Sequence, residues 1–468
     1  MKRLLKKFEK TVLLILKLAL YIILLGIFLS LISKENKAVL VPSRTMGITI
    51  SSYVVVGLLF ISAYGRYDIG RRKSKPIIYS LSLAVICTDV VVYLQLMIMN
   101  TITPSVSAIR FTSIPILLLI MLLQVLIVVI FVYGGNALYF FINEPERCCI
   151  IASSQQAVNE IARGIMKFRK QYLIKYVVDY RRHDLLRYVE QVDTIFVIDV
   201  PLEARGKLID YCYENMKNIY FNPEIHDIVE TTAEYYLLDD ISLINANVKS
   251  LSIEQRIMKR LLDLILVLIV GILSSPVWVV SAIMIKSYDG GKILFKQKRA
   301  TLNGREFEVY KFRTMKENVE NRSVTKDDDR ITPPGKILRK IRADELPQLL
   351  NILRGEMSFV GPRPEMLENV NAYTEELPEF KYRLRAKAGL TGYAQIAGKY
   401  NTSPKDKLMM DMMYIENYSI LKDIQLLFQT AIVLLKSDST EAFGAENCGL
   451  RILPCGEEEK EGKNDENI

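Results

Sequence analysis

Two adjacent carboxylates, Asp344 and Glu345, are the residues of this sequence best suited to chemistry. They stand just before Pro347, and because proline is favoured in the first turn of a helix, we expect a short helix over residues 347–355. A helix N-terminus stabilises negative charge. Adjacent carboxylates nevertheless repel each other unless cations or a metal ion lie near. The pair is therefore either a reactive centre or, in the plainer interpretation, a helix cap that pairs with surface cations.

The surrounding motifs supply the cations that such a pair needs: Lys311, Arg339, Arg342 and Arg363. Arg363 lies between two prolines, in a rigid turn that would hold its guanidinium group towards a phosphate. Carboxylates combined with arginine and lysine are typical of phosphoryl transfer assisted by Mg²⁺, with an aspartate as candidate nucleophile. We therefore predict a Mg²⁺ cofactor, with Asp344 and Glu345 as its candidate ligands.

Four apolar segments precede these motifs, at residues 11–33, 47–64, 77–99 and 114–141. Each is long enough to cross a hydrocarbon core of about 30 Å as a helix. The N-terminus and the second loop carry five lysines or arginines each, against three and one in the alternate loops. This asymmetry predicts that both ends of the bundle face the cytoplasm. Asp89 lies within the third segment, where a functional role and a role in helix packing are both open.

Residues 144–250 alternate short strand patterns with helical patterns, which predicts a small α/β domain with a parallel sheet. A nucleotide-binding domain of this type carries G-x-G-x-x-G after its first strand. Here that position reads ASSQQA, at residues 152–157. Without glycines the backbone cannot approach a pyrophosphate closely, so a docking or regulatory role is favoured over nucleotide binding.

A fifth apolar segment, residues 261–285, has basic residues on both flanks, so both of its ends are expected in the cytoplasm. In its middle lie Ser275 and Pro276. Proline bends a helix sharply, and a serine hydroxyl can bind a carbonyl that the bend frees. We predict a re-entrant hairpin, helix–break–helix, that enters one leaflet and returns. The alternative is an ordinary kinked span.

Six motifs then follow in a fixed order: FKQKR (295–299), VYKFRTM (309–315), DRITPPGKILR (329–339), RADELPQL (342–349), SFVGPRPE (358–365) and KAGLTGYAQ (387–395). Together they resemble the bacterial polyprenyl-phosphate sugar-1-phosphate transferases, the monotopic phosphoglycosyl transferases, over residues 252–436. The upstream architecture also resembles that of the long members of this family. The resemblance implies four parts: a transmembrane bundle (1–143), a Rossmann-like domain (144–250), a mostly helical catalytic domain with the re-entrant hairpin (251–436) and a tail (437–468).

The resemblance also implies roles for individual residues. Asp344 would be the covalent nucleophile, and Glu345 would bind the metal or transfer a proton. Lys311, Arg339 and Arg363 map onto functional cations of the family. Substrate contacts are expected from Lys311, Arg342, Arg363, Tyr393 and Gln395. Departures from the family pattern at Arg342, Ala388 and Tyr393 leave the recognition of the sugar open.

The implied reaction moves a hexose 1-phosphate from a UDP-sugar to undecaprenyl phosphate through an aspartyl-phosphosugar intermediate. UMP and undecaprenyl-diphosphate-sugar would be released, as the first step of exopolysaccharide, capsule or O-antigen synthesis. Glucose or galactose is the expected sugar. The resemblance places the enzyme in the bacterial cytoplasmic (inner) membrane as a multi-pass protein among membrane lipids. Its catalytic domain would face the cytoplasm. Whether the protein forms a homo-oligomer is left open.

Composition restricts the other classes of function. Of the 468 residues, half are hydrophobic and 24% are charged, which indicates a chain part membrane-embedded and part cytosolic. Two histidines disfavour zinc and Ser-His-Asp chemistry, and six scattered cysteines indicate reduced thiols. The net charge of +9 indicates an anionic partner, and no nucleic-acid-binding motif accompanies it. A non-catalytic membrane scaffold is the alternative function, and the acidic end of the chain is expected to be disordered.

Overall fold

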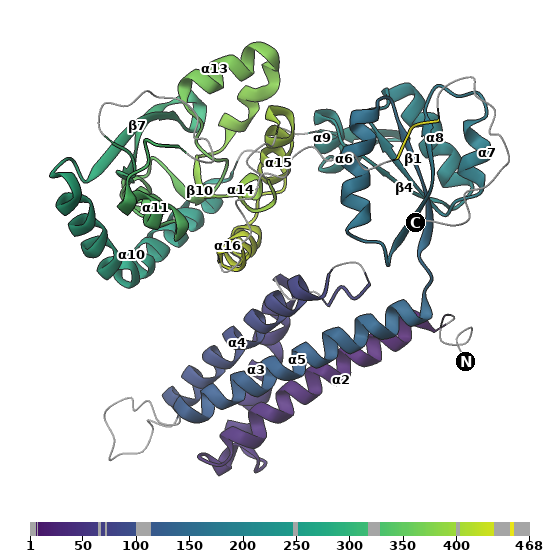
Figure 1. The fold of residues 1–468 in the computed structure, drawn as a ribbon. Helices are drawn as coiled ribbons and strands as arrows, with labels where there is room; N and C mark the ends of the chain where they lie inside the picture. Colours follow the sequence, from purple (N-terminus) through teal and green to yellow (C-terminus); the bar gives the residue numbers. More distant parts are fainter. Residues whose placement is uncertain are drawn as a thin grey trace, which may run out of the picture. The chain divides into compact units, whose positions relative to one another are not determined.

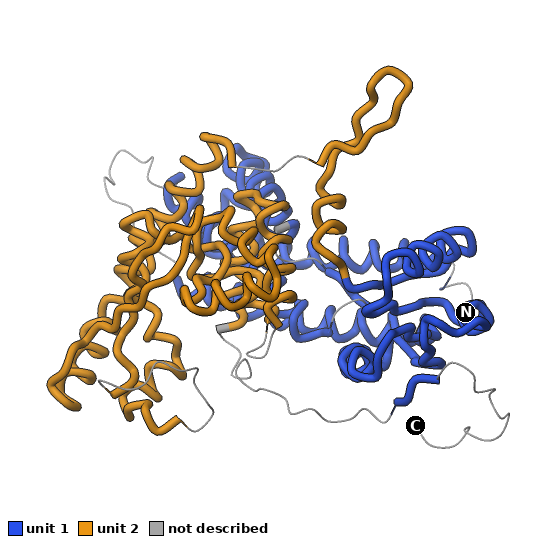
Figure 2. Tube along the Cα trace, turned by 90° about the horizontal axis from the view of Figure 1, so that it is seen from above, with its two compact units in different colours: residues 1–222, 443–468 blue, residues 223–442 orange. Residues whose placement is uncertain are grey.

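The structure, a computed structural model, describes residues 6, 8–63, 67–70, 73–99, 114–246, 251–316, 328–398, 403–434 and 450–453. The chain divides into two compact units (Figure 2): residues 1–222 with 443–468 form unit 1, and residues 223–442 form unit 2. The predicted four-part division is finer and stays a prediction. The acidic end of the chain lies outside the described residues, as do several basic residues that set the predicted orientation: Lys2, Arg3, Lys7, Arg66, Arg71, Arg72, Arg110 and Lys249.

Unit 1 begins with the four predicted apolar helices, which are α2 (Glu9–Ile32), α3 (Arg44–Ala63), α4 (Ser74–Met99) and α5 (Ile114–Ile142). All four are long and apolar enough to cross a membrane. The buried residues of α2 recur every four positions, so one stripe of this helix faces its neighbours. Polar groups lie inside the bundle: Asp89 is fully buried, and Gln124 Nε2 donates to Leu24 O at 3.0 Å and to Tyr53 Oη at 3.1 Å.

The predicted parallel sheet follows in unit 1 (Figure 1). Its strands lie in the order β2-β1-β3-β4, and every pairing is parallel. Apolar clusters fill both faces: α6 covers one face, and α7 and α8 cover the other. The bounds are β1 Glu146–Ala152, α6 Gln155–Met166, β2 Tyr172–Asp179, α7 Leu185–Glu190, β3 Thr194–Ile198, α8 Leu202–Glu214 and β4 Asn218–Phe221.

Unit 2 is mostly helical around one apolar core that includes Leu349, Phe359, Phe380, Leu408 and Met412. It opens with α9 (Ile225–Thr231), whose Ile228 joins that core, and with an exposed hairpin of β5 (Glu234–Leu238) and β6 (Ile241–Asn245). The elements that follow α10 are β7 Leu294–Ala300, β8 Glu306–Phe312, α11 Pro333–Lys340, α12 Gln348–Arg354, β9 Ser358–Val360, α13 Leu367–Glu376, β10 Gly389–Thr391, α14 Tyr393–Ala397, α15 Pro404–Glu416 and α16 Ile420–Leu434.

The fifth apolar segment forms α10, a single helix of 37 residues over Ile253–Asp289, which bends along its length (Figure 1). The helix is not interrupted at Ser275 and Pro276, contrary to the predicted break. Because Pro276 has no backbone N–H, the carbonyl of Ile272 loses its helical partner. The Ser275 hydroxyl donates to that carbonyl at 2.8 Å. The serine therefore plays the predicted part, and it does so within a continuous helix.

The first turns of α10 are fastened to unit 2 by buried polar groups. Lys259 Nζ donates to Asp423 Oδ2 at 2.6 Å, to Val360 O at 3.0 Å and to Tyr414 Oη at 3.0 Å. Asp263 Oδ1 accepts from the backbone N–H of Phe359 at 2.9 Å. A buried lysine is costly unless its hydrogen bonds are satisfied, and here three oxygens bind it.

The last turns of α10 pack on the same unit. Trp278 contacts the ring of Phe312 edge to face, Ile285 is buried among Phe312 and Leu338, and Arg313 Nη1 donates to Asp289 Oδ2 at 2.8 Å. Between the two ends the helix exposes its apolar residues; Leu273, for example, is 75% exposed. The helix thus presents an uncovered apolar middle between two anchored ends.

Replacing Lys259 by Met should therefore leave Asp423 buried without its cation. We expect the free energy of unfolding to fall by about 3–5 kcal/mol. The measurement is denaturation of the detergent-solubilised protein. Arg256→Met, an exposed position on the same helix, is the matched control and should change stability by less than about 0.5 kcal/mol. Equal stability of the Lys259→Met protein and the wild type would show that the buried pair does not hold α10.

Candidate active site

Four separate elements of unit 2 contribute the predicted site residues. Lys311 lies on β8, Arg339 on α11, and Arg363 in the turn that follows β9. Asp344 and Glu345 belong to a 3₁₀ turn, Ala343–Glu345, which ends before α12 begins. The carboxylates therefore precede the predicted short helix in a turn of their own rather than capping it.

Glu345 lies between two cations. Its Oε1 accepts from Lys311 Nζ at 3.1 Å and from Arg363 Nη2 at 2.8 Å. Burial acts to raise the pKa of Glu345, but the charges and hydrogen bonds of Arg363 and Lys311 outweigh it and hold the pKa well below its ordinary value. Glu345 is therefore ionised at neutral pH, and its charge is already neutralised by the protein.

Asp344 has a different environment from its neighbour. Burial raises its pKa, the charge of Glu345 raises it further, and the charges of Lys311 and Arg339 act in the opposite direction. Within the part of the chain that the structure describes, no ion pair joins the Asp344 side chain. Of the two carboxylates, Asp344 is the more basic and the one not already bonded to a cation.

Arg339 is held by Thr314, which lies just after β8, the strand that carries Lys311. Its Nε donates to Thr314 Oγ1 at 2.9 Å, and the backbone N–H of Thr332 donates to Thr314 O at 3.0 Å. Gly335 packs directly on this point: a Cβ added there would lie 2.1 Å from Thr314 O. The first turn of α11 thus requires glycine in order to lie against the residues that follow β8.

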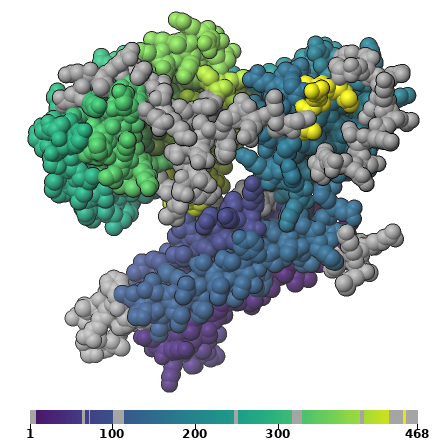
Figure 3. All heavy atoms as spheres, viewed as in Figure 1, coloured from purple at the N-terminus to yellow at the C-terminus, as the bar shows by residue number. Residues whose placement is uncertain are grey.

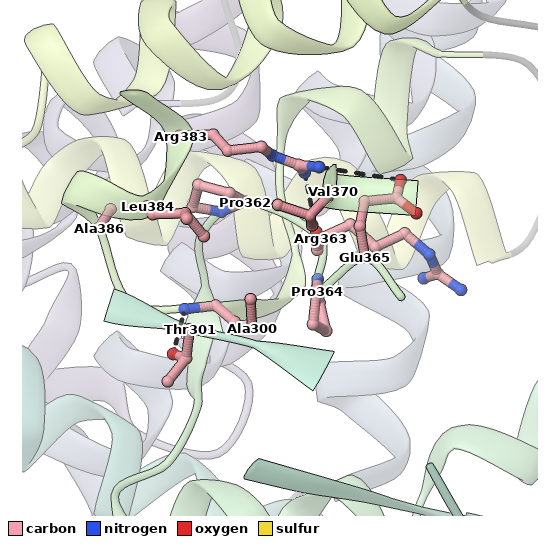
Figure 4. A pocket seen from close by; sticks show the side chains of 11 residues that line it. Ala300, Thr301, Pro362, Arg363, Pro364, Glu365, Val370, Arg383, Leu384 and Ala386 are labelled. Carbon is pink, nitrogen blue, oxygen red and sulfur yellow. Dashed lines mark hydrogen bonds and ion pairs between the residues drawn. The ribbon is translucent and has the colours of Figure 1, made fainter. Parts of the chain in front are cut away.

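Two arginines from other elements hold the turn that carries Arg363, and Figure 4 shows one of them, Arg383, beside it. Arg383 Nη2 donates to Arg363 O at 2.8 Å and pairs with Asp411 at 2.8 Å, while Arg299 Nη1 donates to Pro364 O at 3.1 Å. Glu365 lies 3.8 Å from Arg383. Sequence reasoning missed Arg383 and Asp411 because no local pattern marks them. Arg299 lies in the FKQKR motif, but the motif alone indicates no role for it.

Two predicted substrate residues, Tyr393 and Gln395, have their contacts outside this set. The ring of Tyr393 has Lys422 Nζ 5.2 Å from its centroid, and Gln395 Nε2 donates to Gly389 O at 3.4 Å. Arg342 has a left-handed backbone, with φ of 54°. Among the described residues, no hydrogen bond links Tyr393 or Gln395 to Asp344 or Glu345. Their part in substrate binding stays a prediction.

The donor chemistry of the site fits Mg²⁺ only together with a phosphate. Among the described residues, no group of three or more His, Cys, Asp or Glu side chains could hold a metal ion. Mg²⁺ is commonly bound through one or two carboxylates plus substrate phosphates. Asp344 and Glu345 supply such a pair, although two cations already neutralise Glu345. The metal therefore remains a proposal.

Comparison with known proteins agrees with a site for phosphoryl chemistry. The bacterial sugar transferase family model matches residues 254–437. A UDP-N-acetylgalactosamine-undecaprenyl-phosphate N-acetylgalactosaminephosphotransferase of Aeromonas hydrophila is 37% identical over 38% of this chain and 43% of its own length. A UDP-glucose:undecaprenyl-phosphate glucose-1-phosphate transferase of Caulobacter vibrioides is 37% identical over 39% of this chain and 71% of its own length. An undecaprenyl-phosphate galactose phosphotransferase of Salmonella typhimurium is 33% identical over 39% and 41%.

The chain belongs to the bacterial sugar transferase family. The match starts in the first turn of α10 and ends just beyond α16, so it takes in every element that carries a predicted site residue. The regions that align with the Aeromonas and Salmonella proteins cover less than half of the length of each of those proteins.

The ion pairs of the buried Arg383 should make its contribution to the free energy of unfolding depend on pH. Burial raises the pKa of Asp411 to about 6. Burial also acts to raise the pKa of Glu365, but Lys407 and Arg383 outweigh it and lower that pKa. Arg383→Met should lower the free energy of unfolding by about 3 kcal/mol or more at pH 8, where both carboxylates are ionised, because Asp411 loses its partner while Glu365 keeps Lys407. The loss should shrink at pH 5, where Asp411 is largely protonated. The control is Lys381→Met, an exposed cation of the same segment; equal losses at both pH values would contradict the ionic role of Arg383.

Proposed function

We propose that this protein transfers a sugar 1-phosphate from a UDP-sugar to undecaprenyl phosphate, with Asp344 as covalent nucleophile. The observation that carries the proposal is the asymmetry of the two carboxylates. Glu345 is bonded to Lys311 and Arg363, whereas Asp344 has a raised pKa and no ion pair among the described residues. A nucleophile needs an accessible, basic electron pair, and Asp344 meets that need better than its neighbour.

The proposed reaction has two balanced steps. A carboxylate oxygen of Asp344 attacks the sugar-bearing phosphorus of the donor, and the bond to the bridging oxygen breaks, which releases UMP. A phosphate oxygen of undecaprenyl phosphate then attacks the same phosphorus and displaces Asp344, giving undecaprenyl-diphosphate-sugar. An acyl phosphate and a diphosphate are both high-energy bonds, so neither step requires an external energy source.

The cations around the pair account for stabilisation of the transferring group. Lys311 and Arg363 meet at Glu345, next to the attacking residue, where negative charge develops on the phosphoryl oxygens. Asp344 and Glu345 would hold a Mg²⁺ ion that arrives with the donor, and this ion would neutralise the charge of the diphosphate. Burial raises the pKa of Asp344, and the charge of Arg339 opposes that rise. Arg339 would therefore favour the ionised, attacking form of Asp344.

We further propose that α10 enters the membrane from one face and returns to it. A straight helix of 37 residues would be about 55 Å long, which would place its ends on opposite sides of a bilayer. Both ends instead pack on unit 2, and the apolar middle is exposed. The lipid phosphate lies at headgroup depth, and this arrangement would hold the site at that depth.

The sugar is the least constrained part of the proposal. The relatives are named for N-acetylgalactosamine, glucose and galactose, and the contacts of Tyr393 and Gln395 do not distinguish these. Glucose or galactose stays the proposed hexose, in the priming of an exopolysaccharide at the cytoplasmic membrane. A panel of radiolabelled UDP-sugars with undecaprenyl phosphate in detergent would identify the donor.

Replacing Asp344 by Asn should abolish transfer, because the variant keeps size and hydrogen bonding but loses the attacking charge. We expect kcat to fall by at least about 10³-fold, rather than a rise in KM alone. The assay is formation of lipid-linked sugar from radiolabelled donor. Glu375→Gln, an exposed carboxylate of the same unit, is the control and should keep wild-type activity.

Donor without acceptor should also leave a phosphosugar on Asp344, detected by mass spectrometry after rapid quenching, with release of one UMP. Transfer retained by Asp344→Asn would rule out the covalent route. The alternative of a non-catalytic scaffold would be shown by a folded wild-type protein that transfers none of the sugars.

The membrane proposal is tested at the bend. Replacing Ser275 and Pro276 by Leu-Leu should straighten α10 and favour a full span, whereas Ser274→Leu keeps the proline and serves as control. Cysteines at Arg256 and Lys298 would be labelled with an impermeant thiol reagent in intact cells and in inverted vesicles. When Ser275 and Pro276 are unchanged, both introduced cysteines should react only from the cytoplasmic side. Labelling at position 298 from outside in the wild type would contradict re-entry.

A further inference from the structure

The sheet of unit 1 is joined at its edge to a segment from much later in the chain. β2 is an edge of the four-stranded sheet, and residues 450–453 lie beside it. Leu453 pairs in parallel with Val178: the N–H of Leu453 donates to Val177 O at 2.9 Å, and the N–H of Asp179 donates to Leu453 O at 3.4 Å. Figure 3 shows these residues in yellow against the sheet domain.

One side chain continues this pairing beyond the strand. Gln155 Nε2 donates to Leu450 O at 2.7 Å, and Gln155 Oε1 accepts from the N–H of Ile452 at 3.1 Å. A single amide group thus binds two backbone groups of the segment, as a neighbouring strand would. Gln155 is the first residue of α6, just after β1.

The side chains of the segment alternate between the two faces of the sheet. Leu450 and Ile452 pack on the apolar cluster beneath α6. Leu453 packs on the cluster beneath α7 and α8, and Arg451 between them is exposed. This period of two is typical of extended backbone with both faces in contact with a sheet, and apolar residues at 450, 452 and 453 fill those contacts.

Gln155 lies in the turn where nucleotide-binding α/β domains carry glycines. In nucleotide-binding α/β domains, the turn after the first strand approaches a phosphate through glycines. Here residues 152–157 hold no glycine, and Gln155 in this turn binds a peptide backbone instead. The sheet edge, the amide and the two apolar clusters together form a site for a strand.

We propose that the edge of β2 and Gln155 form a strand-binding site whose ligand is this chain's own segment 450–453, which serves as a latch. The latch returns the chain to unit 1 after the residues of unit 2. A peptide thereby contacts the turn that approaches the phosphate in a nucleotide-binding domain of this type. This assignment does not depend on the proposed transferase reaction.

Hydrogen exchange on the full-length protein in detergent tests the latch. In the wild type, amides of residues 450–453 should exchange at least about tenfold more slowly than in an unstructured peptide. Gln155→Ala should raise their exchange about tenfold, because two hydrogen bonds are lost. Arg451→Ala, whose side chain is exposed, is the control and should leave exchange unchanged. Exchange of the wild-type segment at the rate of a free peptide would overturn the proposal.

A cross-link identifies which chain supplies the strand. Val178 and Leu453 lie opposite each other in the parallel pairing. The double variant Val178→Cys/Leu453→Cys, in a Cys448→Ser/Cys455→Ser background, should form a disulfide within one chain on mild oxidation. Each single variant should form none. A cross-linked dimer as the product would show that a second copy supplies the strand and would overturn an intrachain latch.

Discussion

An apolar helix held at both ends by polar contacts to one unit is the constraint on which unit 2 depends. Lys259 of α10 binds the carbonyl of Val360, and Val360 is the last residue of β9. The next residues form the turn that presents Arg363. The residue that anchors α10 is thus joined through one short strand to a cation of the site. The position of α10 and the position of Arg363 are therefore coupled.

Asp344 and Glu345 are both carboxylic acids, but their environments shift their pKa values in opposite directions. Asp344 and Glu345 are adjacent in the chain, yet opposite forces dominate their pKa values: burial for Asp344, and two bound cations for Glu345. One short turn therefore holds a carboxylate with a raised pKa beside one that two cations keep ionised. The left-handed backbone of Arg342, just before this turn, is an unusual conformation for a residue with a side chain.

The sequence predicted those features that depend on local pattern. Hydropathy located the four bundle helices to within a few residues, and strand and helix periods located the parallel sheet. The family resemblance singled out Lys311, Glu345 and Arg363, and both cations bond to Glu345. It did not predict pairings between distant polar residues. Lys259 and Asp423 are separated by most of unit 2, and neither belongs to a motif, so only tertiary packing reveals the pair. Proline at 276 indicated a break in the helix, but a serine hydroxyl satisfies the freed carbonyl, so the backbone stays helical. Residues 450–453 lie in the predicted tail, where four residues carry too little signal to mark a strand; their partner β2 is distant in sequence and supplies the hydrogen bonds that order them.

That strand has a consequence for the order in which the protein is made. The four strands of the sheet leave the ribosome before any of unit 2, and residues 450–453, which pair with β2, leave after all of it. Throughout synthesis of the intervening residues, the edge of β2 has unpaired backbone groups, which in other proteins are a starting point for aggregation. A long-range parallel pairing of this kind forms slowly. Completion of this sheet edge therefore waits until unit 2 has been synthesised, and a chain truncated before residue 450 would keep an open edge on β2.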